Sequence, residues 1–145
     1  MPKPKKIFFF NEVPINYQLR HKTKIRQWIY DVAQQENHSI IQLNYIFCTD
    51  KYLLQLNQQY LDHHTYTDII TFDNSENDQH IESDIFISTE RVKENAIIFK
   101  VPFTHELYRV MIHGVLHLCG YGDKSKAEIK QMRRKEDFFV KKLLT

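Results

Sequence analysis

Two histidines four residues apart, with an aspartate shortly after them, are the residues of this chain best suited to chemistry. They are His113, His117 and Asp123, in the segment His-Gly-Val-Leu-His-Leu-Cys-Gly-Tyr-Gly-Asp. On a helix, residues i and i+4 share one face, so both imidazoles can reach one metal ion. Gly120 can end such a helix in a left-handed conformation, after which the chain can turn back and deliver Asp123. Three protein ligands leave one position on the metal open, as in catalytic zinc sites.

The alternative interpretation is that His113 and His117 are core residues with backbone partners. Residues 110–119 are otherwise apolar, which is typical of a buried helix. A single histidine there would usually be structural, but a pair with a third ligand just past the helix favours a metal site. In the zinc-protease pattern His-Glu-x-x-His the glutamate is the general base. Gly114 occupies that position here, so a protease of that type would lack its base.

The charge of the chain is nearly balanced overall but unevenly distributed. The formal net charge is +2, and eight of the 18 acidic residues lie between residues 52 and 90, a stretch without Lys or Arg. Basic residues gather in segments 3–26 and 124–142. Basic surface near a metal site suits a polyanionic substrate. Each cluster taken alone is more typical of a solvated helix face.

Length and composition predict one globular domain over residues 1–145, large enough to bury a core. Both cysteines, Cys48 and Cys119, lie in apolar runs and are expected to be free thiols in a reducing compartment. No stretch has the length and apolarity of a membrane span, and the first apolar run is too short for a signal peptide. These features predict a cytoplasmic protein without a membrane partner.

The hydrophobic periodicity predicts the elements that must position these residues. Strands are expected at 5–10, 40–48, 67–72 and 81–88. Helices are expected at 23–35, from an Asp50 N-cap to about 61, from a Ser88 or Thr89 cap toward 99, and from Thr104 through the histidines. A last helix follows a capping box of Ser125 and Glu128. Its inward residues are expected to be Ile129, Met132, Phe139, Val140 and Leu143.

These elements predict an α+β domain in the order βαβαββααα. A small mixed sheet of four strands is packed with about five helices. The metal site is expected at the C-terminal end of the buried helix that carries the two histidines.

At this point the motifs resemble those of a known family. The segment His113-Gly-x-Leu-His117-Leu-x-Gly120-Tyr121 resembles the signature of the YbeY family of metal-dependent endoribonucleases, also called rRNA maturation factors. The resemblance covers residues from about 40 to the C-terminus. Supporting segments are Leu56-Asn57-x-x-Tyr60, Thr67-Asp68-Ile-Ile-x-Phe72, Asp84-Ile85-x-Ile87, and Met132 with Glu136.

The resemblance implies a fold, an activity and partners. It implies one domain that binds one Zn²⁺ per chain through His113, His117 and Asp123. It implies cleavage of single-stranded RNA, maturation of the 3′ end of the small-subunit rRNA, and a role in ribosome quality control. The expected partners are therefore single-stranded RNA and the small ribosomal subunit.

Two positions differ from the usual family pattern. Asp123 stands where the family usually has a third histidine, and this carboxylate would leave the metal site near +1 instead of +2. That ligand set also suits Fe or Mn. Leu61 stands where the family usually has an arginine thought to face the substrate phosphate. Arg109, four residues before His113, is the first candidate for the missing catalytic cation, although a surface salt bridge with Glu106 would explain it equally well.

Further residues could take part. Tyr121 and Lys124, next to the predicted metal turn, are candidates for binding the substrate. Asp68, Asp84 and Glu136 are more plausible as groups that orient a ligand histidine than as a general base.

Two other functions stay open. One is a ribosome-associated assembly factor with a mainly structural metal. The other is a small metallohydrolase or an Fe(II) oxygenase, because two histidines and one carboxylate also suit that chemistry.

Overall fold

The structure is a computed structural model that describes residues 5–60 and 67–145. The order of elements is the predicted one, and the expected α+β class is confirmed. The elements are β1 Ile7–Asn11, α1 Lys22–Gln35, β2 Ser39–Cys48, α2 Asp50–Tyr60, β3 Ile69–Asp73, β4 His80–Ser88, α3 Thr89–Phe99, α4 Phe103–Leu118 and α5 Lys126–Leu144. No helix within the described part of the chain is long and apolar enough to cross a membrane.

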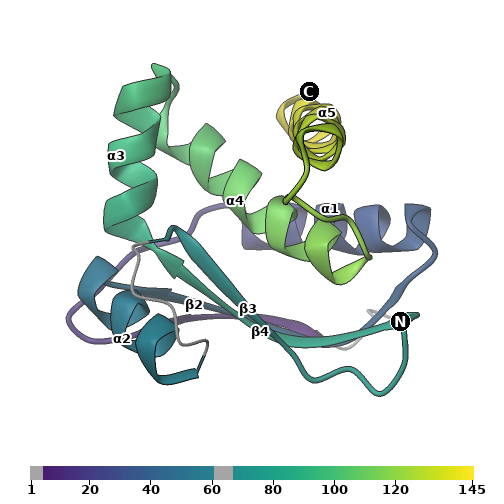
Figure 1. Ribbon diagram of the computed structural model, residues 1–145, viewed down its shortest axis with the longest axis horizontal. Coiled ribbons are helices and arrows are strands. Elements are labelled where there is room, and N and C mark those ends of the chain that lie inside the picture. The colour runs from purple at the N-terminus through teal and green to yellow at the C-terminus, as the bar shows by residue number, and fades with distance from the viewer. Residues whose placement is uncertain (1–4, 61–66) are drawn as a thin grey trace.

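The four strands form one mixed sheet in the spatial order β1-β2-β4-β3. β1, β2 and β4 are parallel, whereas β3 runs antiparallel to β4 and forms an edge. Helical connections return the chain between the parallel neighbours, and β3 and β4 are joined by a short polar loop. Figure 1 shows α1, α4 and α5 on one side of the sheet and α2 on the other.

Alternate residues of the strands supply two separate apolar clusters, as a period of two requires. On β4, Ile85 and Ile87 pack into the main core with α1, α4 and α5, while Phe86 packs into a smaller cluster with Leu53 of α2. On β3, Ile69 faces the main core and Ile70 the smaller cluster. The edge strand β3 is therefore held between α4 and α2.

Helix α4 lies directly on the sheet because Gly114 has no side chain. A Cβ atom there would lie 3.0 Å from the Cδ1 atoms of both Ile69 and Ile85. The glycine that occupies the glutamate position of the zinc-protease pattern thus allows close contact between helix and sheet, and this contact sets the height of His113 above β3.

We expect Gly114→Glu to destabilise the fold strongly, because a long side chain would be forced between the helix and the sheet and its charge would be buried. The expected loss is roughly 3 kcal/mol or more in the free energy of unfolding. Gly114→Ala is the control: its better helix propensity, about 1 kcal/mol, offsets contact with two flexible isoleucine tips. Urea denaturation measures both, and equal stability of the two variants would contradict this packing argument.

Two local expectations were wrong. Asp50 does not cap α2: the Thr49 hydroxyl accepts the hydrogen bond from the Tyr52 backbone N–H at 3.0 Å, and the Asp50 carboxylate pairs with Arg91 at 2.7 Å. Ile129 is 50 % exposed, because it lies at the rim of a pocket and not in the core. The predicted capping box of Ser125 and Glu128 at the start of α5 is confirmed.

Candidate active site

The three predicted metal ligands line a single pocket at the edge of the sheet. His113 and His117 come from the last two turns of α4, and Gly120, with φ of +104°, turns the chain back toward Asp123. The pocket has a volume of about 290 Å³ and its floor is formed by the start of β3. Its lining residues are Thr67, Asp68, Ile69, Thr71, His113, His117 and Asp123.

The ligand atoms approach one another without forming a closed metal cage. His113 Nε2 lies 3.4 Å from Asp123 Oδ2. Among residues 5–60 and 67–145, no three His, Cys, Asp or Glu side chains are arranged to hold a metal ion as they stand. The Asp123 side chain is 46 % exposed and His117 is also exposed, so both have room to reorient.

His113 is fixed by a buried carboxylate from the last helix. Its Nδ1 lies 2.6 Å from Glu136 Oε2, and the Glu136 side chain is only 6 % exposed. Burial alone would lower the pKa of His113, but the hydrogen bond to Glu136 and the charges of Glu136, Asp68 and Asp123 outweigh it and raise the pKa. Because Glu136 engages Nδ1, the ring nitrogen directed toward Asp123 is Nε2. Carboxylate partners orient the rings of metal-ligating histidines in the same way.

Arg109 lies one turn before His113 and contacts three carboxylates. Its guanidinium is 3.1 Å from Asp137, 3.5 Å from Glu106 and 3.8 Å from Glu136. The salt bridge to Glu106 is therefore present, but it is part of a network that also reaches the carboxylate holding His113. In this arrangement Arg109 neutralises acidic side chains around the pocket.

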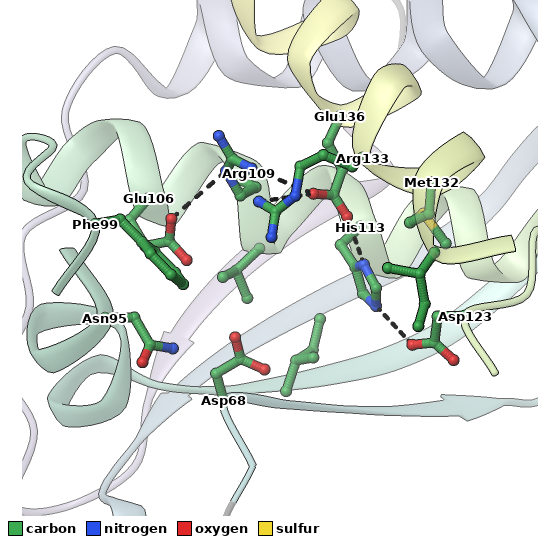
Figure 2. Close-up of a pocket in the computed structure, with 13 residues that line it drawn as sticks. Asp68, Asn95, Phe99, Glu106, Arg109, His113, Asp123, Met132, Arg133 and Glu136 are labelled. Atoms are coloured by element: carbon green, nitrogen blue, oxygen red, sulfur yellow. Dashed lines mark hydrogen bonds and ion pairs between the residues drawn. The ribbon is translucent and has the colours of Figure 1, made fainter. Parts of the chain in front are cut away.

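A second pocket shares a wall with the first and extends from the histidine toward α3. It has a volume of about 280 Å³, and Asp68, Ile69, His113 and Asp123 line both pockets. Figure 2 shows His113 and Asp123 at one end, Asn95, Phe99 and Glu106 at the other, and Asp68 on the floor. Burial raises the pKa of Asp68, although the nearby His113 acts in the opposite direction.

Glu106 is a buried carboxylate on the wall of this second pocket. It is 3 % exposed, and within the described residues its Oε1 has no hydrogen-bond partner, since the 3.5 Å contact with Arg109 Nε is an ion pair without hydrogen-bond geometry. Burial, with the charges of Asp68 and Glu136, raises the pKa of Glu106 to about 7, while Arg133 acts in the opposite direction.

This raised pKa predicts a pH dependence of stability. Because folded Glu106 binds its proton more tightly than the unfolded chain does, its contribution to stability is fully present below about pH 4.5 and is lost as the pH rises through about 7. Glu106→Gln should therefore match the wild type near pH 4.5 and exceed its melting temperature by roughly 5 °C at pH 8. Thermal denaturation at both pH values tests this, and a variant less stable at pH 8 would contradict it.

The comparison with known proteins decides the family. A family model described as endoribonuclease YbeY matches residues 11–144. This chain belongs to the YbeY family. The match extends the resemblance seen in the sequence toward the N-terminus, so it includes α1 as well as the histidine segment.

Individual YbeY relatives cover nearly the whole chain. It is 55% identical over 135 residues to the endoribonuclease YbeY of Cytophaga hutchinsonii, covering 93% of this chain and 94% of the relative. It is 57% identical over 123 residues to that of Flavobacterium psychrophilum, covering 85% and 87%. Among solved structures, a solution structure of a protein from Thermotoga maritima has a TM-score of 0.65 and 26% identity, covering 94% of this chain and 88% of that one.

Three other predicted residues of this YbeY-family chain, Tyr121, Lys124 and Asp84, line neither of the two pockets. Tyr121 is partly buried, and its hydroxyl donates to the Glu36 carboxylate at 2.9 Å, which also accepts from Lys135 at 2.9 Å. Lys124 is exposed and lines neither pocket. Asp84 accepts a hydrogen bond from Asn44 on the sheet. Leu61 lies outside the described residues.

Sequence reasoning missed Glu36 as a residue of the site region. It lies just after α1, 85 positions before Tyr121 in the chain, so no spacing rule connects the two. The signal was weak: a lone acidic residue near the end of an amphipathic helix. Glu36 nevertheless ties α1 and α5 to the turn that delivers Asp123.

Proposed function

We propose that this chain is a metal-dependent endoribonuclease that cleaves single-stranded RNA by phosphodiester hydrolysis. The observation that carries the proposal is the convergence of His113, His117 and Asp123 on one pocket, with His113 held by Glu136. The YbeY-family membership supports ribonuclease chemistry for that pocket, because the matching relatives are named endoribonucleases.

The donor chemistry fits a divalent metal. Two imidazoles and one carboxylate suit Zn²⁺ and are also compatible with Fe or Mn. The Glu136 carboxylate supplies the outer partner that such a histidine needs. When bound, one such ion per chain would polarise a phosphoryl oxygen and lower the pKa of a water molecule. The Asp123 carboxylate lowers the charge of this site relative to three imidazoles, so we expect weaker attraction of the substrate phosphate.

The protein's own residues would position the RNA and balance charge. His113 presents Nε2 to the pocket because Glu136 occupies Nδ1. Arg109 offsets the negative charge of the acidic side chains around the site. Its guanidinium would contact a substrate phosphate after giving up its ion pair with Asp137, its closest partner. Lys124, one residue after Asp123, is exposed and suits the RNA backbone farther from the reacting centre. Tyr121 acts by holding the turn, with Glu36 as its partner.

The biological setting that we propose follows the family. Residues 1–145 act as one catalytic domain in the cytoplasm on ribosomal RNA, with the 3′ end of the small-subunit rRNA as the substrate and the small subunit as the partner. The exposed basic residues of α5, including Lys130 and Arg134, support contact with a polyanion. A role in ribosome quality control belongs to the same proposal.

Cleavage of an end-labelled single-stranded RNA with the small-subunit 3′ precursor sequence tests the function. Native, chelated and zinc-restored protein are compared with His117→Ala. We expect cleavage to be lost on chelation, regained with zinc and absent in the variant. Equal cleavage by His117→Ala would show that the activity does not depend on a metal ion bound at this pocket.

The competing proposal is an assembly factor whose metal is mainly structural. It is favoured by the engagement of Arg109 with three carboxylates, which leaves this candidate cation committed to the protein. Metal-dependent RNA binding without turnover would support it over the nuclease.

A further inference from the structure

One end of the second pocket carries polar and aromatic groups that the proposed hydrolysis does not use. Asn95 and Phe99 lie four residues apart on α3, so their side chains share a face of that helix. Phe99 is 50 % exposed at the end of the helix. The Asn95 side-chain amide makes no hydrogen bond with any residue in 5–60 or 67–145 and is only partly exposed. An aromatic face and an unpaired amide thus lie together at the mouth of the pocket.

Glu106 makes this end of the pocket selective. It is more than nine-tenths buried, lines the same pocket, and its Oε1 lacks a hydrogen-bond partner among the described residues. A buried carboxylate without full hydrogen bonding is costly and favours a ligand that donates N–H groups. Asp68 on the floor adds a second carboxylate. Arg109 and Arg133 also line this pocket, but both are paired with acidic side chains. The Glu106 oxygen without a hydrogen bond therefore favours a neutral group with N–H donors at this end.

We propose that Asn95, Phe99 and Glu106 form a subsite for one nucleobase of the RNA, next to the phosphate that the site cleaves. Phe99 offers a ring on which the base stacks, and the Asn95 amide supplies a donor and an acceptor for the base edge. Glu106 accepts a hydrogen bond from an N–H of the base. The Arg133 guanidinium carbon lies over the Phe99 ring, 6.0 Å from its centre, and places a positive charge on one face of that ring. The inference rests on the proposed function, since it names how the same pocket reads its RNA.

A protein contact is the other use for exposed apolar residues at this place. Ile97 and Ile98, next to Phe99, are also exposed, at 70 % and 62 %. A protein surface resting on that run would not require a buried carboxylate and a free amide inside the pocket, whereas a base uses both. The polar groups therefore favour RNA over a protein partner.

The experiment measures binding of a short fluorescent single-stranded RNA to the full chain by anisotropy, with a chelator present so that the RNA stays intact. Phe99→Ala should weaken binding about tenfold, the effect of losing one stacked base, and Phe99→Trp should restore it. Asn95→Ala should weaken binding severalfold. Phe138→Ala is the matched control, because Phe138 is 47 % exposed on α5 and lines no described pocket. Melting temperatures confirm that each variant is folded.

A set of RNAs with one abasic position each completes the test. At one position, the abasic RNA should lose about as much affinity for the wild type as the Phe99→Ala substitution removes. The same abasic position should reduce the affinity of the Phe99→Ala variant only slightly further. Equal effects of every abasic position on both proteins, or unchanged binding by both Phe99→Ala and Asn95→Ala, would overturn the subsite. RNA binding with this pattern but without metal-dependent cleavage would leave the subsite intact and reject the nuclease. A wild type that binds no RNA either with the chelator or with zinc restored would reject both.

Discussion

Asp123→Ala is expected to lower metal occupancy sharply and to reduce RNA cleavage at least 100-fold. The change removes one of three proposed ligands, whose Oδ2 lies 3.4 Å from His113 Nε2 in the pocket. Two imidazoles alone are too few to hold a catalytic ion tightly, since such sites use three protein ligands. Metal content after dialysis and cleavage of end-labelled RNA are the two measurements.

Two further variants make the Asp123 experiment specific. Asp123→His restores a third ligand of the kind usual in the family, so we expect it to recover occupancy and to bind zinc at least as well as the wild type. Asp78→Ala is the matched control, because Asp78 is exposed in the loop between β3 and β4 and lines neither pocket. Unchanged occupancy in Asp123→Ala would remove Asp123 from the ligand set.

The second large effect is expected for Glu136→Ala, which should impair both stability and metal binding. Glu136 is buried and meets three groups: His113 at 2.6 Å, Arg133 at 3.7 Å and Arg109 at 3.8 Å. Removing one partner of a buried ionic network costs about 3–5 kcal/mol because the other charges stay behind. Losing the outer partner of a ligand histidine typically weakens metal affinity by 10–100-fold.

Glu136→Gln separates these two roles. Its amide oxygen can still accept from His113 Nδ1, so ring orientation is kept while the negative charge is lost. We expect metal affinity to recover partly in this variant and stability to remain below the wild type, measured by metal titration and urea denaturation. Glu94→Ala, which removes an exposed glutamate of α3, should leave metal affinity unchanged. If Glu136→Ala binds metal as the wild type does, Glu136 is only a structural residue.

Much of the fold was predictable because local signals agreed with one another. The strand predicted at 40–48, the Ser88 cap and the capping box at Ser125 each depend on neighbours a few residues away, and all three are confirmed. The alternation along that strand holds from Leu43 to Phe47 but not at Ile41, which is 43 % exposed beside a β-bulge. Ile129 was misplaced because helical periodicity marks a face but does not reveal that a pocket opens beside it. The sequence also indicates Glu136 as a group that orients a ligand histidine, and its carboxylate lies 2.6 Å from His113 Nδ1.

The candidate site was predictable only where its residues are close in sequence. His113 and His117 follow from helix geometry, and Asp123 from the turn after Gly120. The contacts of Glu36 with Tyr121 and of Arg109 with Asp137 depend on how distant helices pack, which spacing alone does not define. The pocket end formed by Asn95, Phe99 and Glu106 arises between α3 and α4 and has no signature along the chain.

The hydrogen bond between Tyr121 and Glu36 also bears on how short a functional fragment of this chain can be. Every residue of the histidine signature lies in the last third of the chain, yet the turn that carries Asp123 is anchored to the end of α1. A second link joins α1 to α5, because the Trp28 indole N–H donates to the Phe139 carbonyl at 2.8 Å. A fragment starting after residue 38 would keep the whole signature but lose both anchors. The smallest functional fragment of this protein is therefore determined by its tertiary contacts. A truncation to the histidine signature would remove contacts that hold the site in place.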